Sequence, residues 1–352
     1  GLTAKPTNSV IGSGTDAKQT PITSRLELSP GSLISVSLLE ATTGSEITIP
    51  YGMTPDGVRW LDPSGRDITL AGLPQKRVSL SAGTVAFSNA ATIDIRGGGD
   101  IYGYRWIQGP GGFEDILASQ NSYAILPKAG LSFAPYAPFN QSAGELTGNP
   151  GYHNANLFPG DSITINQGGP LPTGTYTLLP ARYALLPGAY LITPYENLAR
   201  SSSDPHSSFV SKGAGALALA DGSWLVTGGL GNSFTPGRGR NAQASTFRLL
   251  DAKSVRERSE YVDFYGNEFF ASAASKRDSA PQRLPKDAGS LKFIASSSVS
   301  LSGAVKSSPS AGARPSIIDI TVPGTLFVSG ASGAVAPSGS SILDESIFST
   351  WQ

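Results

Sequence analysis

The segment "VAFSNAATIDIRG" at residues 85–97 shows the pattern on which our prediction of the fold depends. Val85 and Phe87 lie two residues apart, and Ile93 and Ile95 repeat that spacing after a short stretch of small and polar residues. Alternation with a period of two is typical of a β-strand that buries one face. The segment therefore predicts two short strands joined by a turn.

The same spacing of 2, 6, 2 and 2 residues recurs in two other segments of the chain. "LELSPGSLISVSL" begins at Leu26 and "LKFIASSSVSLSG" begins at Leu291, so both residues correspond to Val85, and looser versions lie at 68–80 and 318–328. A unit of two short strands cannot bury its apolar face alone, but it can do so against a neighbour of the same kind. The repeats predict an all-β solenoid, in which each pair of strands forms one coil of a stack.

The repeats also predict how the chain is divided. We expect a flexible segment, or one that leads into the first coil, at residues 1–25, and coils at 26–127 and 289–352. Between them the pattern weakens, and text rich in Pro, Tyr and Phe replaces it. Residues 128–288 are therefore predicted to form an excursion from the solenoid.

A second repeat, "YTLLPARYALLPGAYL" at residues 176–191, has a period of seven. Three tyrosines recur at this interval: Tyr176, Tyr183 and Tyr190. A heptad is also the signature of a coiled coil, but Pro180 and Pro187 each cost a helix interior about 3 kcal/mol, and they force the preceding residues into extended geometry. We predict short strands and turns, with the tyrosines on one face and the leucines buried against the solenoid. A helix there would contradict this interpretation.

Residues 251–275 are predicted to form one helix. Asp251 is a suitable N-cap, whereas Gly266 would weaken the helix by about 1 kcal/mol. Apolar residues fall near helical spacing at Val255, Val262, Tyr265, Phe269 and Ala273. We expect this stripe to pack on the solenoid, and the alternative is a stripe that binds a groove on a partner.

Composition excludes several classes of protein. The chain has 26 basic and 26 acidic residues, without the basic surplus that a nucleic-acid binder needs. It has no cysteine, hence no disulfide or thiolate metal site, and no run of 18 apolar residues that would insert into a membrane. The chain begins Gly1-Leu-Thr without Met or a signal-type segment, which indicates a piece of a longer protein.

Motifs for catalysis and cofactor binding are also missing from the sequence. There is no P-loop, and "RGGGDIYG" at 96–103 has Tyr102 where a dinucleotide-binding motif needs Gly, so we interpret its glycines as a tight corner. The common hydrolase signatures are absent. His153 and His206 are 53 residues apart and are interpreted as surface residues rather than zinc ligands. We expect no enzymatic activity, no cofactor and no metal.

Two groups of side chains are weighed as functional residues. Solenoid enzymes that act on polysaccharides place carboxylates on adjacent coils, but here they stand singly beside apolar positions and are expected to face solvent. These carboxylates are Asp94, Asp100, Glu114, Asp115 and Asp319. Aromatic side chains with polar rims bind sugars or proteins, and the alternative is that they form the core of the excursion. The candidate contact surface comprises Tyr102, Tyr104, Trp106, Tyr136, Tyr152, Tyr176, Tyr183 and Tyr190.

Several segments, at 78–117, 123–127, 172–194 and 283–305, resemble the filamentous-haemagglutinin-like large exoproteins. These are bacterial adhesins exported by two-partner secretion, and the resemblance covers residues 26–330. It implies a right-handed parallel β-helix with excursions, located outside the cell or on the bacterial surface. The family's amino-terminal secretion domain and carboxy-terminal toxin domain are not matched, and the family has no shared active site.

The resemblance implies a structural shaft and display segment of a secreted adhesin, attaching to glycans or proteins of host cells or other bacteria. Because terminal coils expose unpaired strand edges, we also expect contact with neighbouring segments of a long chain or end-to-end self-association. The alternatives are the shaft of a contact-dependent toxin-delivery exoprotein, a self-assembling extracellular filament and a polysaccharide-active β-helix enzyme.

Overall fold

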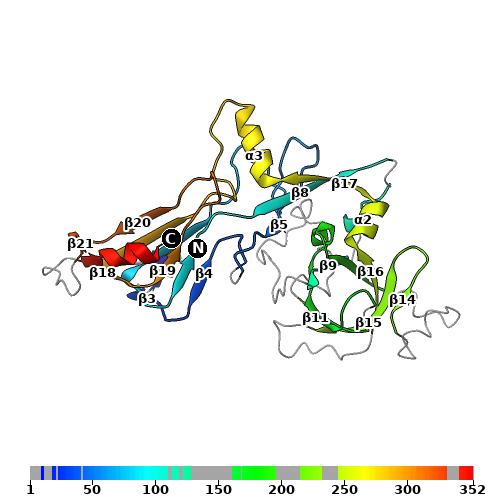
Figure 1. Ribbon diagram of the computed structural model, residues 1–352, viewed down its shortest axis with the longest axis horizontal. Coiled ribbons are helices and arrows are strands. Elements are labelled where there is room, and N and C mark those ends of the chain that lie inside the picture. The colour runs from blue at the N-terminus through cyan, green and yellow to red at the C-terminus, as the bar shows by residue number, and fades with distance from the viewer. Residues whose placement is uncertain are drawn as a thin grey trace. The chain divides into compact units, whose positions relative to one another are not determined.

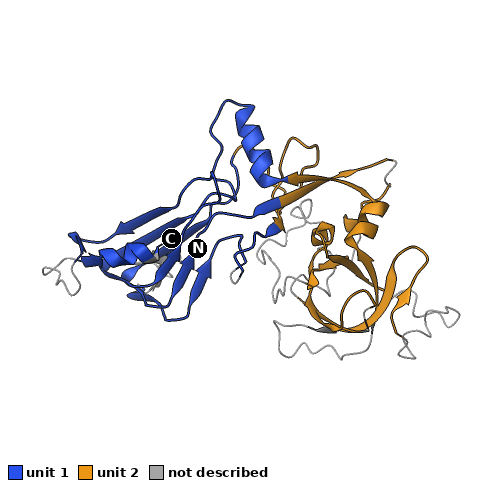
Figure 2. Ribbon diagram, in the orientation of Figure 1, with its two compact units in different colours: residues 1–48, 71–101, 265–352 blue, residues 49–70, 102–264 orange. Residues whose placement is uncertain are grey.

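The computed structural model describes eleven stretches of the chain, and strands are the main regular secondary structure in them (Figure 1). These stretches are 9–11, 18–20, 23–40, 43–109, 113–118, 122–127, 161–167, 169–195, 215–231, 245–330 and 341–351. Two α-helices occur among them, so the all-β prediction is confirmed. The chain forms two compact units: unit 1 comprises 1–48, 71–101 and 265–352, and unit 2 comprises 49–70 and 102–264 (Figure 2).

The unit boundaries differ from the expected division of the chain. Residues 49–70 and 102–127, expected in coils, belong to unit 2, whereas 265–288, expected in the excursion, belong to unit 1. The cause is strand pairing, since β8 (Asp100–Ile107) joins a sheet with β5 (Thr48–Pro50) and β17 (Glu260–Tyr265) instead of continuing the stack. Unit 2 is therefore made from two separate stretches of chain.

Unit 1 contains two sheets of parallel strands. The first has the order β20 (Ile317–Thr321), β18 (Ser290–Leu301), β6 (Arg77–Phe87) and β3 (Arg25–Leu28). The second has the order β19 (Ala304–Lys306), β7 (Thr92–Asp94) and β4 (Leu33–Ser35). Successive strand pairs along the chain thus occupy successive places in both sheets.

The predicted register is confirmed for the first two repeats and is wrong for the third. Leu26 pairs with Val85, and Ile34 pairs with Ile93, as the common spacing predicted. Leu291, however, pairs with Val78, and Val299 takes the place opposite Val85. The six-residue step after Phe293 is not a turn, because β18 continues through it with a register shift between Ala295 and Ser298.

The core of unit 1 lies between the inward faces of these strands. Phe293 is buried against Phe87, with ring centroids 6.0 Å apart, and Trp351 stacks on Phe293 at 6.2 Å. Trp351 also donates from Nε1 to the carbonyl of Gly303 at 3.2 Å. A Cβ at Gly303 would lie 2.2 Å from the Phe87 ring, so only glycine allows this close approach.

Further elements complete unit 1. These are the antiparallel pair β1 (Ser9–Ile11) and β2 (Lys18–Thr20), the helix α3 (Gly266–Ser275), the parallel pair β21 (Leu326–Ser329) and β22 (Ser341–Asp344), and the 3-10 helix η6 (Glu345–Thr350).

The single helix predicted at 251–275 is wrong. Its first part is α2 (Ala252–Arg258), and Asp251 caps it as predicted, accepting a hydrogen bond from the Ser254 amide at 2.7 Å. The strand β17 then interrupts it, because pairing with β8 overrides the helical spacing, and α3 begins only at Gly266. A Cβ at Gly266 would lie 2.3 Å from Ile101 Cγ1, so glycine serves close packing there. Val262 and Tyr265 are exposed and form no buried stripe.

Unit 2 is built around an antiparallel sheet that curls toward a barrel. Its order is β11 (Gly174–Thr177), β10 (Ser162–Gln167), β15 (Trp224–Gly231), β16 (Ser245–Asp251), β13 (Tyr190–Pro194), β9 (Tyr123–Ile125) and β12 (Leu179–Pro180), and β14 (Leu217–Ala218) pairs with β15. The end strands β11 and β12 are consecutive in the chain, which draws the two edges together. The short 3-10 helix η2 (Ile116–Ala118) also belongs to this unit.

The heptad-like repeat contributes β11, β12 and β13, but a 3-10 helix, η5 (Ala181–Leu185), lies between them. The prediction of strands and turns alone is therefore wrong, because Pro180 stands directly before the helix and Pro187 after it, where neither breaks it. The tyrosines do not share a face: Tyr183 is buried, whereas Tyr176 and Tyr190 are half-buried in a different cluster. The leucines are buried as predicted, but in the core of unit 2 itself.

Candidate functional site

Three residues of the predicted aromatic contact surface belong to the core of unit 2. Tyr102, Tyr104 and Tyr183 are buried, so the contact-surface prediction is wrong for them and the alternative of a packed core is correct. The remaining described members, Trp106, Tyr176 and Tyr190, are half-buried. Tyr136 and Tyr152 lie outside the described residues.

Two tyrosines of this core, Tyr102 and Tyr261, form hydrogen bonds through their hydroxyls to carboxylates of unit 2. Tyr102 donates to Asp263 Oδ1 at 2.6 Å, and Arg256 Nη2 donates to the same oxygen at 3.0 Å. Tyr261 meets Tyr104 edge to face at 5.6 Å and donates to Asp115 Oδ1 at 2.6 Å. Burial raises the pKa of the Asp115 carboxyl above its ordinary value, against the hydrogen bond from Tyr261. These contacts stabilise unit 2 and leave little of the predicted surface exposed.

The carboxylates weighed as catalytic residues are dispersed. Glu114 and Asp319 are exposed as expected, but Asp94 is only 2% exposed. It accepts hydrogen bonds from Arg96 Nε at 3.0 Å and Nη2 at 2.7 Å, which compensate its burial. Asp100 is half-buried and accepts from the amides of Ile101 at 2.8 Å and Asn267 at 2.9 Å. The carboxylates of Asp94 and Asp100 thus accept hydrogen bonds that stabilise the fold.

A groove on unit 1, here called the unit 1 groove, is a candidate binding site formed by described residues. It has a volume of about 710 Å³, within the roughly 300–1,000 Å³ typical of ligand sites. Its lining comes from three parallel strands and from the loops beside them: Gln75, Arg77, Ser79, Gln282, Arg283, Ser290, Leu291, Lys292, Arg314, Ile317 and Asp319. The register of the strands places three of these residues in a row, with Arg77 beside Ser290 and Ser290 beside Ile317.

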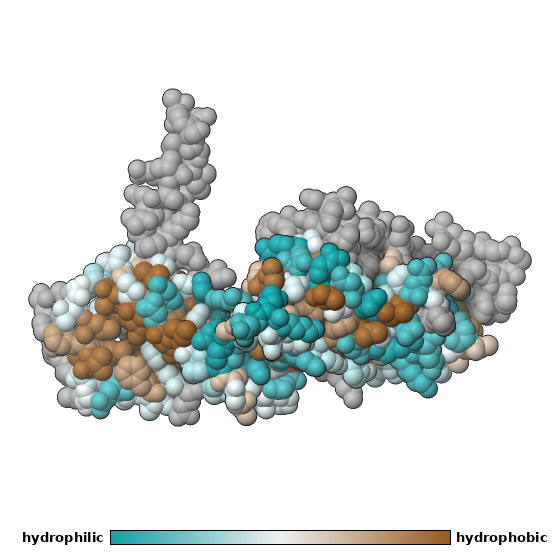
Figure 3. All heavy atoms as spheres, turned by 90° about the horizontal axis from the view of Figure 1, so that it is seen from above, coloured by the Kyte–Doolittle hydropathy of each residue, from teal (hydrophilic) through white to brown (hydrophobic). Residues whose placement is uncertain are grey.

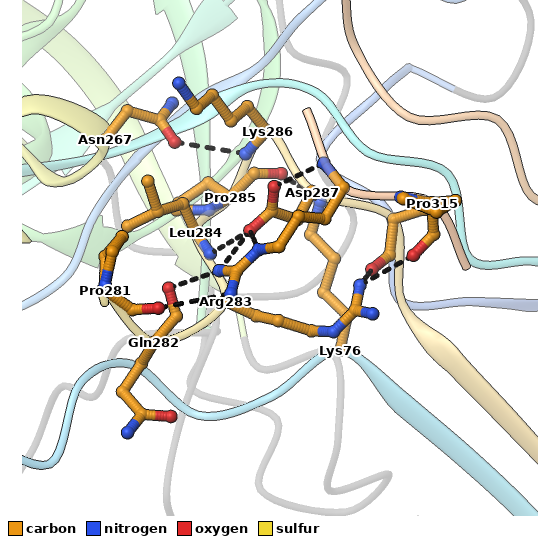
Figure 4. Close-up of polar contacts among 12 residues, drawn as sticks. Lys76, Asn267, Pro281, Gln282, Arg283, Leu284, Pro285, Lys286, Asp287 and Pro315 are labelled. Atoms are coloured by element: carbon orange, nitrogen blue, oxygen red, sulfur yellow. Dashed lines mark hydrogen bonds and ion pairs between the residues drawn. The ribbon is translucent and has the colours of Figure 1, made fainter. Parts of the chain in front are cut away.

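Asp287 organises the loop at 281–288 that borders the groove (Figure 4). Its side chain is 3% exposed, and it accepts hydrogen bonds from the Leu284 and Arg314 amides, both at 2.8 Å. Arg314 adds bonds from Nε at 2.9 Å and Nη2 at 2.6 Å, and it also donates to the carbonyls of Pro281 and Gln282. Burial opposes ionisation of Asp287, but these hydrogen bonds outweigh it and hold its pKa below the ordinary value.

Lys76 connects this loop to the glycine corner at 97–99. Its Nζ donates to the carbonyls of Arg96 at 3.2 Å, Gly98 at 3.3 Å and Pro285. Burial lowers the pKa of this ammonium group to about 8, although the charges of nearby carboxylates oppose the shift. Left-handed backbone at Gly98 (φ +129°) makes the tight corner that the sequence predicted. The loop is therefore held by side chains at both ends.

The cations of the unit 1 groove differ in how far they are neutralised. Lys292 pairs with Asp319 at 2.9 Å, and Arg314 pairs with Asp287. Arg77 donates from Nη2 to the amide oxygen of Gln75 at 2.7 Å. Arg283 donates from Nη1 to the carbonyls of Ala288 at 2.6 Å and Pro315 at 2.9 Å.

Within the described part of the chain, neither Arg77 nor Arg283 forms an ion pair with a carboxylate. The groove therefore carries two guanidinium charges that are not neutralised, and it is suited to bind an anion.

Sequence reasoning did not find this groove. Arg77 and Ser79 alternate with buried Val78 and Leu80, so the outward face of β6 could have been read from the sequence. What the sequence could not show is that residues more than 200 positions away, such as Arg283, lie beside them.

Comparisons with known proteins give no relative for this chain. No family model, curated protein or solved structure matches it. In the described stretches no three His, Cys, Asp or Glu residues are grouped to hold a metal ion, while His153 and His206 lie outside them. No described helix is both long enough and apolar enough to cross a membrane.

Proposed function

We propose that the chain is a structural shaft and display segment of a secreted bacterial surface adhesin, which mediates attachment to host cells, glycans or other bacteria. The observation that carries the proposal is the repeated addition of strand pairs to the same two parallel sheets of unit 1. Residues 49–70 and 102–264 leave this stack between its strands and make a separate unit. Such an arrangement suits a protein that carries binding units along a stiff support.

The finer proposal for unit 1 is a right-handed parallel β-helix. Its support is the common strand order, in which β3, β6 and β18 are followed by β4, β7 and β19 at the same neighbouring places. Parallel strands joined by crossovers in one sheet are right-handed in about 98% of cases. An experimental structure of unit 1 tests this directly, and a left-handed path of the coils would contradict it.

The proposed role is mechanical and adhesive rather than catalytic. Among the residues that line the unit 1 groove, Asp319 is the one carboxylate, and Lys292 holds it in an ion pair. Acid and base catalysis of glycoside hydrolysis normally takes two carboxylates that face the same bond. The lining of the groove therefore favours binding.

Attachment of the purified chain to epithelial cells, bacterial cells, and glycan and matrix-protein arrays tests the proposal. A second protein lacks unit 2, with short Gly-Ser turns in place of 49–70 and 102–264. The second turn joins residues that are already close, because a Cβ on Gly266 would touch Ile101. Loss of binding in this protein would assign recognition to unit 2, and retention would assign it to unit 1. If the full chain binds none of these surfaces, the adhesin proposal is wrong.

A second candidate function, a subunit of a self-assembling filament, is favoured by the edge strand β20. Ile318 continues the inward row of Val78 and Leu291, but it is half-buried, whereas Leu291 is 1% exposed. Apolar residues nearby are exposed as well: Ile317 (55%), Phe327 (40%) and Val328 (59%). Figure 3 shows an extensive hydrophobic area on the visible face of unit 1.

An open edge of this kind can pair with another strand. Sedimentation velocity over a range of concentrations tests this function. A chain that stays monomeric at the highest concentration would rule it out.

A further inference from the structure

We propose that the unit 1 groove binds a carboxylate-bearing polysaccharide of the uronate type, with Arg77 and Arg283 holding its carboxylates. This inference rests on the proposed function, because it names the ligand class for attachment through unit 1. Three features of the groove carry it: its free charge, its uncharged amide and hydroxyl side chains, and its position across neighbouring strands.

The free charge selects an anionic ligand of low charge density. Arg77 and Arg283 have guanidinium donors that no carboxylate of the described residues occupies. The planar fork of a guanidinium matches a carboxylate, to which it can donate two parallel hydrogen bonds. Asp319 on the same face neutralises Lys292, which limits the positive charge available to a ligand. A uronate chain carries one charge per sugar and therefore fits two separated guanidinium groups.

Uncharged polar side chains of the lining are suited to the hydroxyl groups of a sugar. Four side chains of the groove carry amide or hydroxyl groups that can both donate to and accept from sugar hydroxyls: Gln75, Ser79, Gln282 and Ser290. Of the apolar lining residues, Leu291 is buried and Ile317 is 55% exposed. The exposed Ile317 side chain is suited to pack against the apolar face of a sugar ring.

The position of the groove selects a chain rather than a small ion. Arg77, Ser290 and Ile317 form a row across three adjacent parallel strands. With neighbouring strands about 4.8 Å apart, the row is roughly 10 Å long. Arg283 is anchored beside this row through its bonds to Ala288 and Pro315. A ligand that reaches both arginines must therefore lie across the strands.

The experiment measures binding of the full chain to a short oligogalacturonate by isothermal titration calorimetry. The methyl ester of the same oligosaccharide is the uncharged control, dextran sulfate tests charge density, and poly-glutamate tests an acidic peptide. Three variants are compared with the unchanged chain. Arg77→Gln removes one free guanidinium. Arg25→Gln removes an exposed arginine of β3, outside the groove, which pairs with Glu27 of the same strand. Asp319→Asn removes the opposing carboxylate.

We expect the oligogalacturonate to bind more tightly than its methyl ester, dextran sulfate and poly-glutamate. Arg77→Gln should weaken binding about tenfold or more, the usual effect of losing a hydrogen bond between charged groups, whereas Arg25→Gln should leave it unchanged. Asp319→Asn should strengthen binding, because it frees Lys292. A merely structural role of these residues would not produce opposite effects.

The inference is overturned if poly-glutamate or dextran sulfate binds as tightly as the oligogalacturonate, if the methyl ester binds equally well, or if Arg25→Gln and Arg77→Gln weaken binding alike. Unfolding of Arg77→Gln in urea at the same concentration as the unchanged chain shows that the variant is folded. If the oligogalacturonate does not bind while the full chain still attaches to cells, the uronate site alone is refuted. Absence of all attachment would refute the proposed adhesin function.

Discussion

The substitution Asp287→Ala tests whether one buried carboxylate holds the loop at 281–288 in place. Asp287 accepts four hydrogen bonds, two from Arg314 side-chain nitrogens and two from the backbone amides of Leu284 and Arg314. Alanine would remove all four at once. It would leave the Arg314 guanidinium without its counter-ion and two amides without acceptors.

The magnitude follows from the burial of the pair. The Asp287 side chain is 3% exposed and that of Arg314 is 43% exposed, so the carboxylate is desolvated while part of the guanidinium still contacts water. Breaking a fully buried pair by removing one partner costs about 3–5 kcal/mol. Because Arg314 can partly return to water, we expect the lower end of that range, about 3 kcal/mol, for the free energy of unfolding of unit 1.

The matched control is Asp319→Ala, which breaks an ion pair in the same unit. The side chains of Lys292 and Asp319 are 43% and 49% exposed, and exposed pairs contribute at most about 1 kcal/mol. Hydrogen exchange of peptides from β6 and β18, followed by mass spectrometry in increasing urea, measures both variants. In Asp287→Ala the Leu284 and Arg314 amides should also exchange quickly without urea.

The dependence on pH provides an internal check. The pKa of Asp287 is held below its ordinary value, so the unfolded chain takes up a proton at higher pH than the folded one. The stability that Asp287 contributes should therefore be complete above about pH 4 and be lost as the pH falls below it. If Asp287→Ala and Asp319→Ala lose the same stability at pH 7, the central role assigned to Asp287 is refuted.

Three further predictions concern single positions. The pKa of Lys76 is about 8 in the folded chain against an ordinary 10.5, so the folded state loses the proton at lower pH than the unfolded state. Unit 1 should therefore become more stable as the pH rises from about 8 to 10.5, and Lys76→Met should abolish this increase in stability. Carbon NMR of the lysine side chain measures the midpoint of its titration. Gly97→Ala would place a Cβ 2.1 Å from the Lys286 carbonyl oxygen and should cost about 3 kcal/mol in urea unfolding, whereas Gly229→Ala, with no atom within 4 Å, should cost under about 1 kcal/mol. Tyr183→Ala should destabilise unit 2 by about 3–5 kcal/mol because the side chain is buried; a loss below about 1 kcal/mol in thermal unfolding would show that it is not a core residue.

Local patterns predicted the parts of the fold that depend on neighbours in sequence. Asp251 was expected to cap a helix, and it does so because capping involves its own side chain and an amide three residues away. The glycines at 97–99 were expected to form a tight corner, and positive φ angles at Gly98 and Gly99 confirm it. Both features require no knowledge of the distant chain.

Contacts between distant segments determined the secondary structure where our prediction from the sequence was wrong. The apolar spacing at 251–275 is nearly helical, but β17 forms there because β8 offers a partner strand. Prolines at 180 and 187 excluded a long helix, yet they permit the five residues of η5 between them. In the first case pairing with a distant strand outweighed the local preference for helix. In the second case the prolines lie outside the ends of a short helix, where they do not disrupt it.

The alternation of apolar residues by itself determined that the chain is built of strands. It also determined that the side chains of Val85, Phe87 and Ile93 point inward, because alternation is a property of each strand alone. The register of β18, the two-part origin of unit 2 and the unit 1 groove were decided only by the tertiary structure. The groove needs Arg77 and Arg283, more than 200 residues apart, on the same surface. Their proximity depends on which strands pair, and many pairings are compatible with the same local pattern.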